Sequence, residues 1–259
     1  MTTKQKDLVP HFGKEGMVID CIDKSHGQVP GEIFDYLYVL RRTRLLATSQ
    51  NPPTRENLRL ILDEYLRGWG SMGRTLGGKS YGEKDPVLDK LKMSIYDHWK
   101  QVRDLSKLKI WTLETSGQLK PLSELFEGLH QSWVRKGVND GRKRFRSHVA
   151  VGKLLHILLP DLCIIWDDEN VLKRKFAIPK KDPGKFQKSG EGYAHYIDFK
   201  ADQLRNLARS HSIPTERYAS HLEQLHRQTL LRKFPELRRA EVEPVTKLLD
   251  ELNYLRPEA

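Results

Sequence analysis

Apolar residues recur along most of the chain with the spacing of an amphipathic helix. The clearest example follows Thr54, where apolar side chains from Leu58 to Leu66 return at every third or fourth position. Alternation of apolar and polar residues, which is typical of a half-buried strand, is nearly absent. The pattern therefore predicts an all-α protein. Expected helices start at Thr54, at Asp85 with Pro86 and at Pro121, and further helices cover about 31–48, 148–159, 169–177, 200–212, 216–233 and 243–254.

Two irregular stretches interrupt these helices. Residues 68–85 are rich in glycine, and residues 179–193 are rich in lysine, glycine and proline, so both are interpreted as loops. The helices on either side of 179–193 lack separate apolar cores, so this loop does not divide the chain. We therefore expect residues 1–259 to form a single helical domain.

The charge of the chain is strongly basic. Its 259 residues include 45 Lys and Arg against 34 Asp and Glu, a formal net charge of +11, which favours a polyanion such as nucleic acid. No apolar run approaches the roughly 20 residues of a membrane span, and the first residues lack the apolar region of a secretory signal. We therefore expect a cytoplasmic protein with no membrane partner. The two cysteines are too few for a four-cysteine metal site, and Cys163, in an apolar run, is expected to be a buried free thiol.

A dense basic run, residues 135–146, precedes an apolar helix. Its glycines allow backbone amides to approach a phosphate closely, and the N-terminus of the following helix favours negative charge. We interpret the run as a site for DNA phosphates, with a solvated basic turn as the alternative. Its basic residues are Arg135, Lys136, Arg142, Lys143, Arg144 and Arg146.

Three acids follow a second apolar stretch. Pro160 is expected to end the helix 148–159, and the sequence DLCIIW then carries the chain through the interior to Asp167, Asp168 and Glu169. A single carboxylate there can cap the next helix and interact favourably with its dipole. Two adjacent acids in a basic surface also suit a carboxylate that faces an electron-poor centre. The residues alone leave both interpretations open.

The order of a helix, a short apolar connector, an aspartate and a basic helix resembles the helix-hairpin-helix DNA glycosylases. That family has an apolar residue followed by Asp-x-x-Val and a basic residue, and this chain has WDDENVLKR over 166–174. The apolar–Asp step selects Asp167, whereas the Asp-x-x-Val spacing selects Asp168. The sequence HVAVGK, residues 148–153, stands in place of the Leu-Pro-Gly-Val-Gly hairpin of the family. The match covers only this part of the chain.

The resemblance implies two interlocked helical lobes and a monomer that hydrolyses an N-glycosidic bond in double-stranded DNA without a cofactor. Cleavage passes through an oxocarbenium-like sugar, so a carboxylate beside the sugar stabilises the developing positive charge. The resemblance gives this role to Asp167, with Asp168 as the alternate. Some members also cleave the backbone through a lysine Schiff base. Lys153 is the candidate, but it stands one residue earlier than the lysine of the family, so we expect a monofunctional enzyme.

The target base must leave the helical stack, and aromatic or apolar side chains receive it. Residue type suggests four candidates for this base pocket, with core packing as the alternative for each: Trp69, Met72, Tyr81 and Trp166. Further candidates for contacts with DNA are Arg74 in the glycine-rich loop, Lys185 in the lysine-rich loop, and Gly152.

The histidines do not have the spacing of a zinc site, so no metal is expected. His156 lies on the apolar face of KLLHILL, and we expect it to be a core histidine with satisfied hydrogen bonds.

The loops suggest an unusual substrate, and the resemblance extends to anti-phage members of the family that remove glucosylated hydroxymethylcytosine from viral DNA. Two other functions stay open. One is a non-catalytic helical protein that binds DNA or RNA. The other is a magnesium-dependent nuclease in which Asp167, Asp168 and Glu169 bind the ion, although adjacent acids at one helix start rarely converge on one ion.

Overall fold

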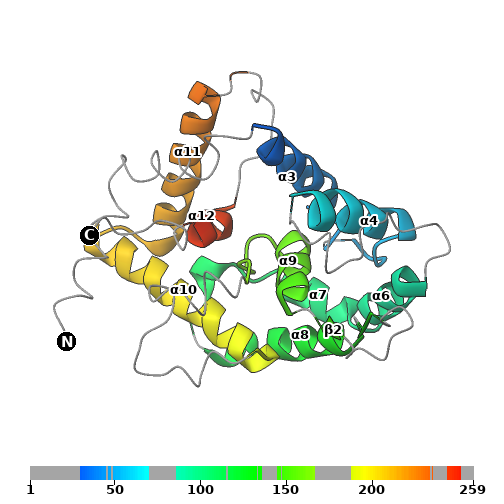
Figure 1. Cartoon of the computed structure of the whole chain (residues 1–259). Coiled ribbons are helices and arrows are strands. Elements are labelled where there is room, and N and C mark those ends of the chain that lie inside the picture. The colour runs from blue at the N-terminus through cyan, green and yellow to red at the C-terminus, as the bar shows by residue number, and fades with distance from the viewer. Residues whose placement is uncertain are drawn as a thin grey trace.

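The computed structural model describes most of the chain between residues 30 and 251. The described residues are 30–44, 46–47, 49–69, 86–114, 116–132, 134–135, 145–146, 148–166, 188–233, 235 and 244–251. They are mostly helical, which confirms the all-α prediction (Figure 1). No helix in this part of the chain combines the length and the apolar character that crossing a bilayer requires.

The described elements are helices, apart from one small strand pair. In chain order the elements are α3 (Pro30–Thr43), α4 (Arg55–Leu60), the π-helix η2 (Ile61–Trp69), α6 (Pro86–Asp97), α7 (Trp99–Leu105), the 3₁₀ helices η3 (Ile110–Thr112) and η4 (Ser116–Leu119), α8 (Lys120–Ser132), the strands β1 (Val134–Arg135) and β2 (Phe145–Arg146), α9 (His148–Leu158), α10 (Gly190–Ser210), α11 (Thr215–Lys233) and α12 (Val245–Glu251). The helix α8 packs against α10, while α9 contacts α3, η2 and α8 near the middle of the molecule (Figure 1). The helix expected over 169–177 lies outside the described residues.

Two of the expected helix starts are confirmed. The Thr54 hydroxyl accepts a hydrogen bond from the Asn57 amide at 3.2 Å, and the Asn57 side chain accepts one from the Thr54 amide at 3.1 Å. This reciprocal pair satisfies two amides that the helix itself leaves unbonded. Pro86 begins α6, because a proline in the first turn loses no helical hydrogen bond.

The start of α10 differs from the expectation. Composition predicts a loop over 179–193 and a helix only from residue 200, but α10 begins at Gly190. Ser189 caps this helix, since its side chain accepts a hydrogen bond from the Gly192 amide at 3.1 Å. The loop prediction is therefore wrong for the last residues of that segment.

The glycine at the start of α10 permits close contact with α8. A side chain at position 190 would overlap the backbone carbonyl of Ser123. The Gly190 amide also donates a hydrogen bond of 2.7 Å to the Glu127 carboxylate. Gly190 is therefore required for the packing of α10 on α8. The glycine-rich composition around it was interpreted as a loop, and this interpretation is wrong here.

A buried group of charges joins α10 to α12. Lys200 is 3% exposed, and its ammonium lies 5.9 Å from the centre of the Tyr196 ring. Burial lowers the pKa of Lys200 to about 8, and the nearby carboxylate of Asp250 offsets only part of this effect. Asp250 also pairs with Lys247 at 3.4 Å, so among the described residues this carboxylate interacts with two amines.

Replacing Lys200 with methionine is expected to raise the free energy of unfolding at pH 7, by about 1–3 kcal/mol, because it removes a desolvated charge and leaves the Lys247–Asp250 pair. The difference in the free energy of unfolding between the variant and the wild type should decrease above pH 8. In this range Lys200 loses its proton in the folded protein at a lower pH than in the unfolded chain. The stability of the wild type therefore rises relative to that of the variant. Chemical denaturation of both proteins from pH 7 to 10 measures this difference, and a gap that widens with pH would contradict the account.

Candidate functional site

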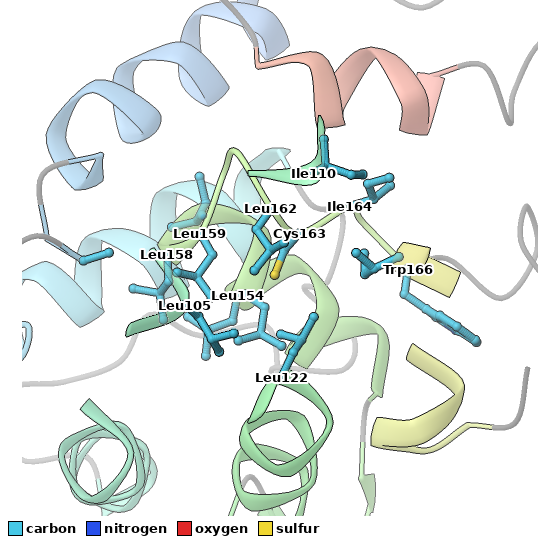
Figure 2. Packing of buried hydrophobic residues seen from close by; sticks show 14 of the residues in the cluster. Leu105, Ile110, Leu122, Leu154, Leu158, Leu159, Leu162, Cys163, Ile164 and Trp166 are labelled. Carbon is cyan, nitrogen blue, oxygen red and sulfur yellow. The ribbon is translucent and has the colours of Figure 1, made fainter. Parts of the chain in front are cut away.

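The segment that leads to the acids crosses the interior as predicted. We call residues 159–166, between α9 and Asp167, the connector. Every connector residue except Asp161 is buried. Figure 2 shows the connector side chains that belong to one apolar cluster with Leu154, Ile110 and Leu122, namely Leu159, Leu162, Cys163, Ile164 and Trp166. The segment is thus a part of the core that ends at Trp166.

Hydrogen bonds from four surrounding elements hold the connector backbone. Tyr193 of α10 donates its hydroxyl to the Ile164 carbonyl at 2.7 Å, and the Asp161 carbonyl accepts from the Ile110 amide at 2.9 Å. Thr246 of α12 donates to the Pro160 carbonyl, and His156 of α9 bonds the Cys163 carbonyl. Because each bond comes from a different element, the path of the connector is fixed along its length.

His156 has the core role expected from its position. It is fully buried, its Nδ1 lies 2.7 Å from the Cys163 carbonyl, and its Nε2 lies 2.8 Å from the Tyr36 hydroxyl. A carbonyl only accepts, so Nδ1 carries the proton, and Nε2 forms the hydrogen bond with the Tyr36 hydroxyl. The prediction of a satisfied core histidine is confirmed. The ring thereby ties α3, α9 and the connector together.

Two further features of the connector concern charge and reactivity. The carboxylate of Asp161 forms ion pairs with Lys109 and with Arg44, the latter at 3.9 Å. The Cys163 thiol is buried and free, as predicted, and burial raises its pKa well above the ordinary value. A thiol in this state is chemically inert, so Cys163 contributes packing rather than chemistry.

Aromatic side chains from four segments form a continuous row beside the end of the connector. The ring centre of His148, at the start of α9, lies 6.3 Å from that of His130 of α8 and 6.3 Å from that of Trp166. Trp166 in turn lies 6.2 Å from Tyr193 and meets Tyr196 edge-on at 5.4 Å. Ring pairs at these distances stabilise packing. We call these five residues the aromatic row.

The aromatic row brings together the described ends of three segments with predicted functional residues. The strand β1 begins two residues after α8, and α9 begins two residues after β2, so the basic run 135–146 starts and ends close to His130 and His148. The acids follow Trp166 directly, and the segment 179–193 ends at Tyr193. The described ends of the basic run, Trp166 directly before the acids, and the described end of the lysine-rich segment therefore share one region of the fold.

The electrostatics of this region favour negative charge. Both α9 and α10 begin here, and the N-terminus of a helix carries a partial positive charge. The Glu127 carboxylate already accepts from the amide at the start of α10. The start of α9 has no acid in its first turn, and it is preceded by the arginine-rich end of the basic run.

The first and last residues of the basic run lie in the paired strands β1 and β2. Val134 pairs with Arg146, and Arg135 pairs with Phe145, in an antiparallel register. In this backbone register the two arginines are diagonal neighbours rather than direct cross-strand partners. The first and last residues of the run therefore belong to two paired strands between α8 and α9, whereas the sequence predicted no strand there.

Most of the other predicted site residues lie outside the described part or have no described side chain. For Arg135, Arg146 and Trp69 the structure describes the backbone alone, within β1, β2 and the end of η2. Lys153 is half-buried on α9, and its lyase role stays a prediction. Outside the described residues are Asp167, Asp168, Lys136, Arg142, Lys143, Arg144, Lys185, Met72, Arg74 and Tyr81.

The helix expected over 148–159 is confirmed as α9, so the hairpin that the resemblance implies at HVAVGK is wrong. Gly152 lies inside that helix, and its amide belongs to the helical hydrogen-bond ladder. A Cβ atom at position 152 would stand 2.9 Å from the Cβ of Trp166. Gly152 is buried and lets the connector pack closely on α9, so the expected contact between Gly152 and DNA does not fit the structure.

Trp166 has a packing role, which was the alternative to its place in a base pocket. Its side chain is 1% exposed and lies within the aromatic row. Its grouping with His130, His148 and Tyr193 could not be predicted, because no local sequence pattern pairs residues on different helices. Within the described residues, no three His, Cys, Asp or Glu side chains gather as a metal ion would require.

Comparison with known proteins identifies no relative: no family model, no curated protein and no solved structure matches this chain.

Proposed function

We propose that the protein is a monofunctional DNA glycosylase that hydrolyses the N-glycosidic bond of a modified base in double-stranded DNA. The supporting observation is that the connector ends beside both ends of the basic run, next to the starts of α9 and α10. In this proposal the basic run holds the DNA backbone and a carboxylate after Trp166 acts on the sugar. The protein works as a monomer and uses no cofactor.

The connector explains why a carboxylate there is suited to catalysis. A group that stabilises a transition state must be held in place before the reaction, since reorganising it would cost part of the benefit. The fixed path of the connector supplies such a support up to Trp166. Asp167 is the first candidate for the catalytic carboxylate and Asp168 the alternate. The carboxylate would stabilise the positive sugar and orient the attacking water.

The basic run is expected to contact phosphates without distinguishing sequences. Replacing Arg142 and Arg144 together with alanine should weaken binding to all duplexes alike and reduce the salt slope of log K by about 2, because each lost phosphate contact removes about one released counterion. Fluorescence anisotropy over a salt series measures this slope. The matched control replaces the exposed Arg227 and Arg232 of α11 with alanine, which changes the net charge equally. Equal slopes in the two double variants would remove the assignment.

The proposed substrate is a modified base, with glucosylated hydroxymethylcytosine of phage DNA as the first candidate and antiviral defence as the resulting role. Genomic DNAs carrying glucosylated hydroxymethylcytosine, hydroxymethylcytosine or unmodified cytosine can be incubated with the protein and probed for abasic sites. We expect abasic sites in one modified DNA, with and without a chelator. Strand breaks that form without the chelator and not with it, in the absence of abasic sites, would instead support the magnesium-dependent nuclease.

A non-catalytic DNA-binding protein is the second candidate. The burial of Trp166 and the helical state of HVAVGK favour it, because both features then have purely structural explanations. In that case the acids after the connector only cap a helix. Tight binding to every DNA of the panel without abasic sites in any of them would support this second candidate and remove the first.

A further inference from the structure

The helix α6 exposes two large apolar side chains on one face. Met93 is 60% exposed and Tyr96 is 61% exposed, and they lie one turn apart. Among the described residues, Tyr38 of α3 is the other exposed large hydrophobic side chain. Single exposed apolar residues are common on protein surfaces, but two neighbours on one turn form a small patch.

The orientation of α6 is fixed, so this patch cannot turn inward. Leu88, Leu91 and Ile95 on the opposite face are buried in the core. Asp89 forms an ion pair with Arg55 of α4 at 2.5 Å. At the end of α6, the ring of His98 packs directly over Gly128 of α8. Met93 and Tyr96 are therefore held on the outside by contacts with α4 and α8.

The charges around the patch are mostly positive. Lys92 lies four residues before Tyr96 on α6, and Lys100 lies in the first turn of α7, which follows directly; both side chains are exposed. Lys100 shares the Asp104 carboxylate with Lys107, at 2.9 Å and 3.0 Å. Over residues 90–100 there are three lysines and one acid. We call Lys92, Met93, Tyr96 and Lys100 the Tyr96 face.

We propose that the Tyr96 face binds a single strand of nucleic acid. One base stacks on the Tyr96 ring and contacts the Met93 side chain, and the flanking lysines meet the phosphates on either side. Proteins that hold single strands without sequence preference combine these two features, exposed aromatic rings and nearby positive charge. This activity is separate from the proposed base excision in duplex DNA, and it does not require that excision to occur.

A second copy of the chain fits this surface poorly. A two-fold contact would place the lysines of one copy close to those of the other, and each chain carries a net charge of +11. The patch also contains only two apolar side chains, too few for the interface of a stable dimer. The surplus of lysines instead complements a phosphate backbone.

The test is direct binding of the full chain to a fluorescent single-stranded oligothymidine, which carries no modified base and needs no base release. Tyr96→Ala should weaken binding roughly tenfold, whereas Tyr96→Phe should retain wild-type affinity because the ring remains. Lys92→Gln should reduce the salt slope of log K by about 0.7, the value for one phosphate contact with a single strand.

Tyr38→Ala is the matched control. Tyr38 is also an exposed helical tyrosine, but Arg42 already lies over its ring, 5.6 Å from the centre, and donates a 2.8 Å hydrogen bond to its hydroxyl. This variant should bind oligothymidine as the wild type does. Wild-type affinity in Tyr96→Ala, or equal losses in Tyr96→Ala and Tyr38→Ala, would overturn the proposal. So would a dimer in sedimentation experiments that Tyr96→Ala dissociates. None of these results depends on whether the protein excises bases.

Discussion

Replacing Asp167 with asparagine is expected to lower the rate of base release by about 10²–10³-fold while binding to DNA survives. Asparagine keeps the shape of the side chain and part of its ability to cap a helix. It removes the negative charge that would stabilise the oxocarbenium-like sugar. The rate is measured under single-turnover conditions on a modified duplex, and binding is measured by anisotropy on the same duplex.

The variant Asp168→Asn is the internal control, since the apolar–Asp step and the Asp-x-x-Val spacing select different acids. Whichever variant keeps its fold and binding but loses base release marks the catalytic position. If the acids were only caps, each substitution would cost about 1 kcal/mol of stability or less and leave the rate nearly intact. Wild-type rates in both variants would show that the catalytic interpretation is wrong.

Replacing His156 with leucine is expected to lower the free energy of unfolding by about 2–5 kcal/mol. The substitution keeps an apolar side chain in the core but leaves the Cys163 carbonyl and the Tyr36 hydroxyl without the partners they have now. Two buried polar groups would then lose hydrogen bonds at once. Chemical denaturation measures the loss.

His221 of α11 provides the control, because it is exposed and its replacement with leucine should change stability by less than about 0.5 kcal/mol. A double-mutant cycle with Tyr36→Phe isolates one of the two bonds. In that background His156→Leu should cost less than in the wild type, since the hydroxyl is already gone. Equal costs in both backgrounds would show that the bond to Tyr36 contributes nothing to stability.

The sequence predicted those parts of the fold that depend on local patterns. Thr54 and Pro86 were recognisable as helix starts because capping and proline geometry involve only neighbouring residues. The connector was recognisable because a continuous apolar run after Pro160 is expected to be buried in the interior. His156 could be assigned to the core from its position on an apolar helical face.

The remaining features depend on contacts between distant segments. The glycines around position 190 have the composition of a loop, but α8 approaches so closely that only glycine fits at the start of α10. Gly152 resembled the glycine of a hairpin in sequence. In the structure it is a helix residue that allows Trp166, distant in sequence, to pack closely on α9. The aromatic row joins residues up to 66 positions apart, from His130 to Tyr196, and no local pattern indicates such partners.

The central claim is that this protein releases a modified base from duplex DNA, and the most direct measurement is detection of the free base. A duplex with one glucosylated hydroxymethylcytosine is incubated with excess protein in the presence of a chelator, and the small molecules are analysed by mass spectrometry. The account predicts free glucosylated hydroxymethylcytosine in an amount equal to the abasic sites formed. An intact duplex that remains bound to the protein, with no free base, would contradict it.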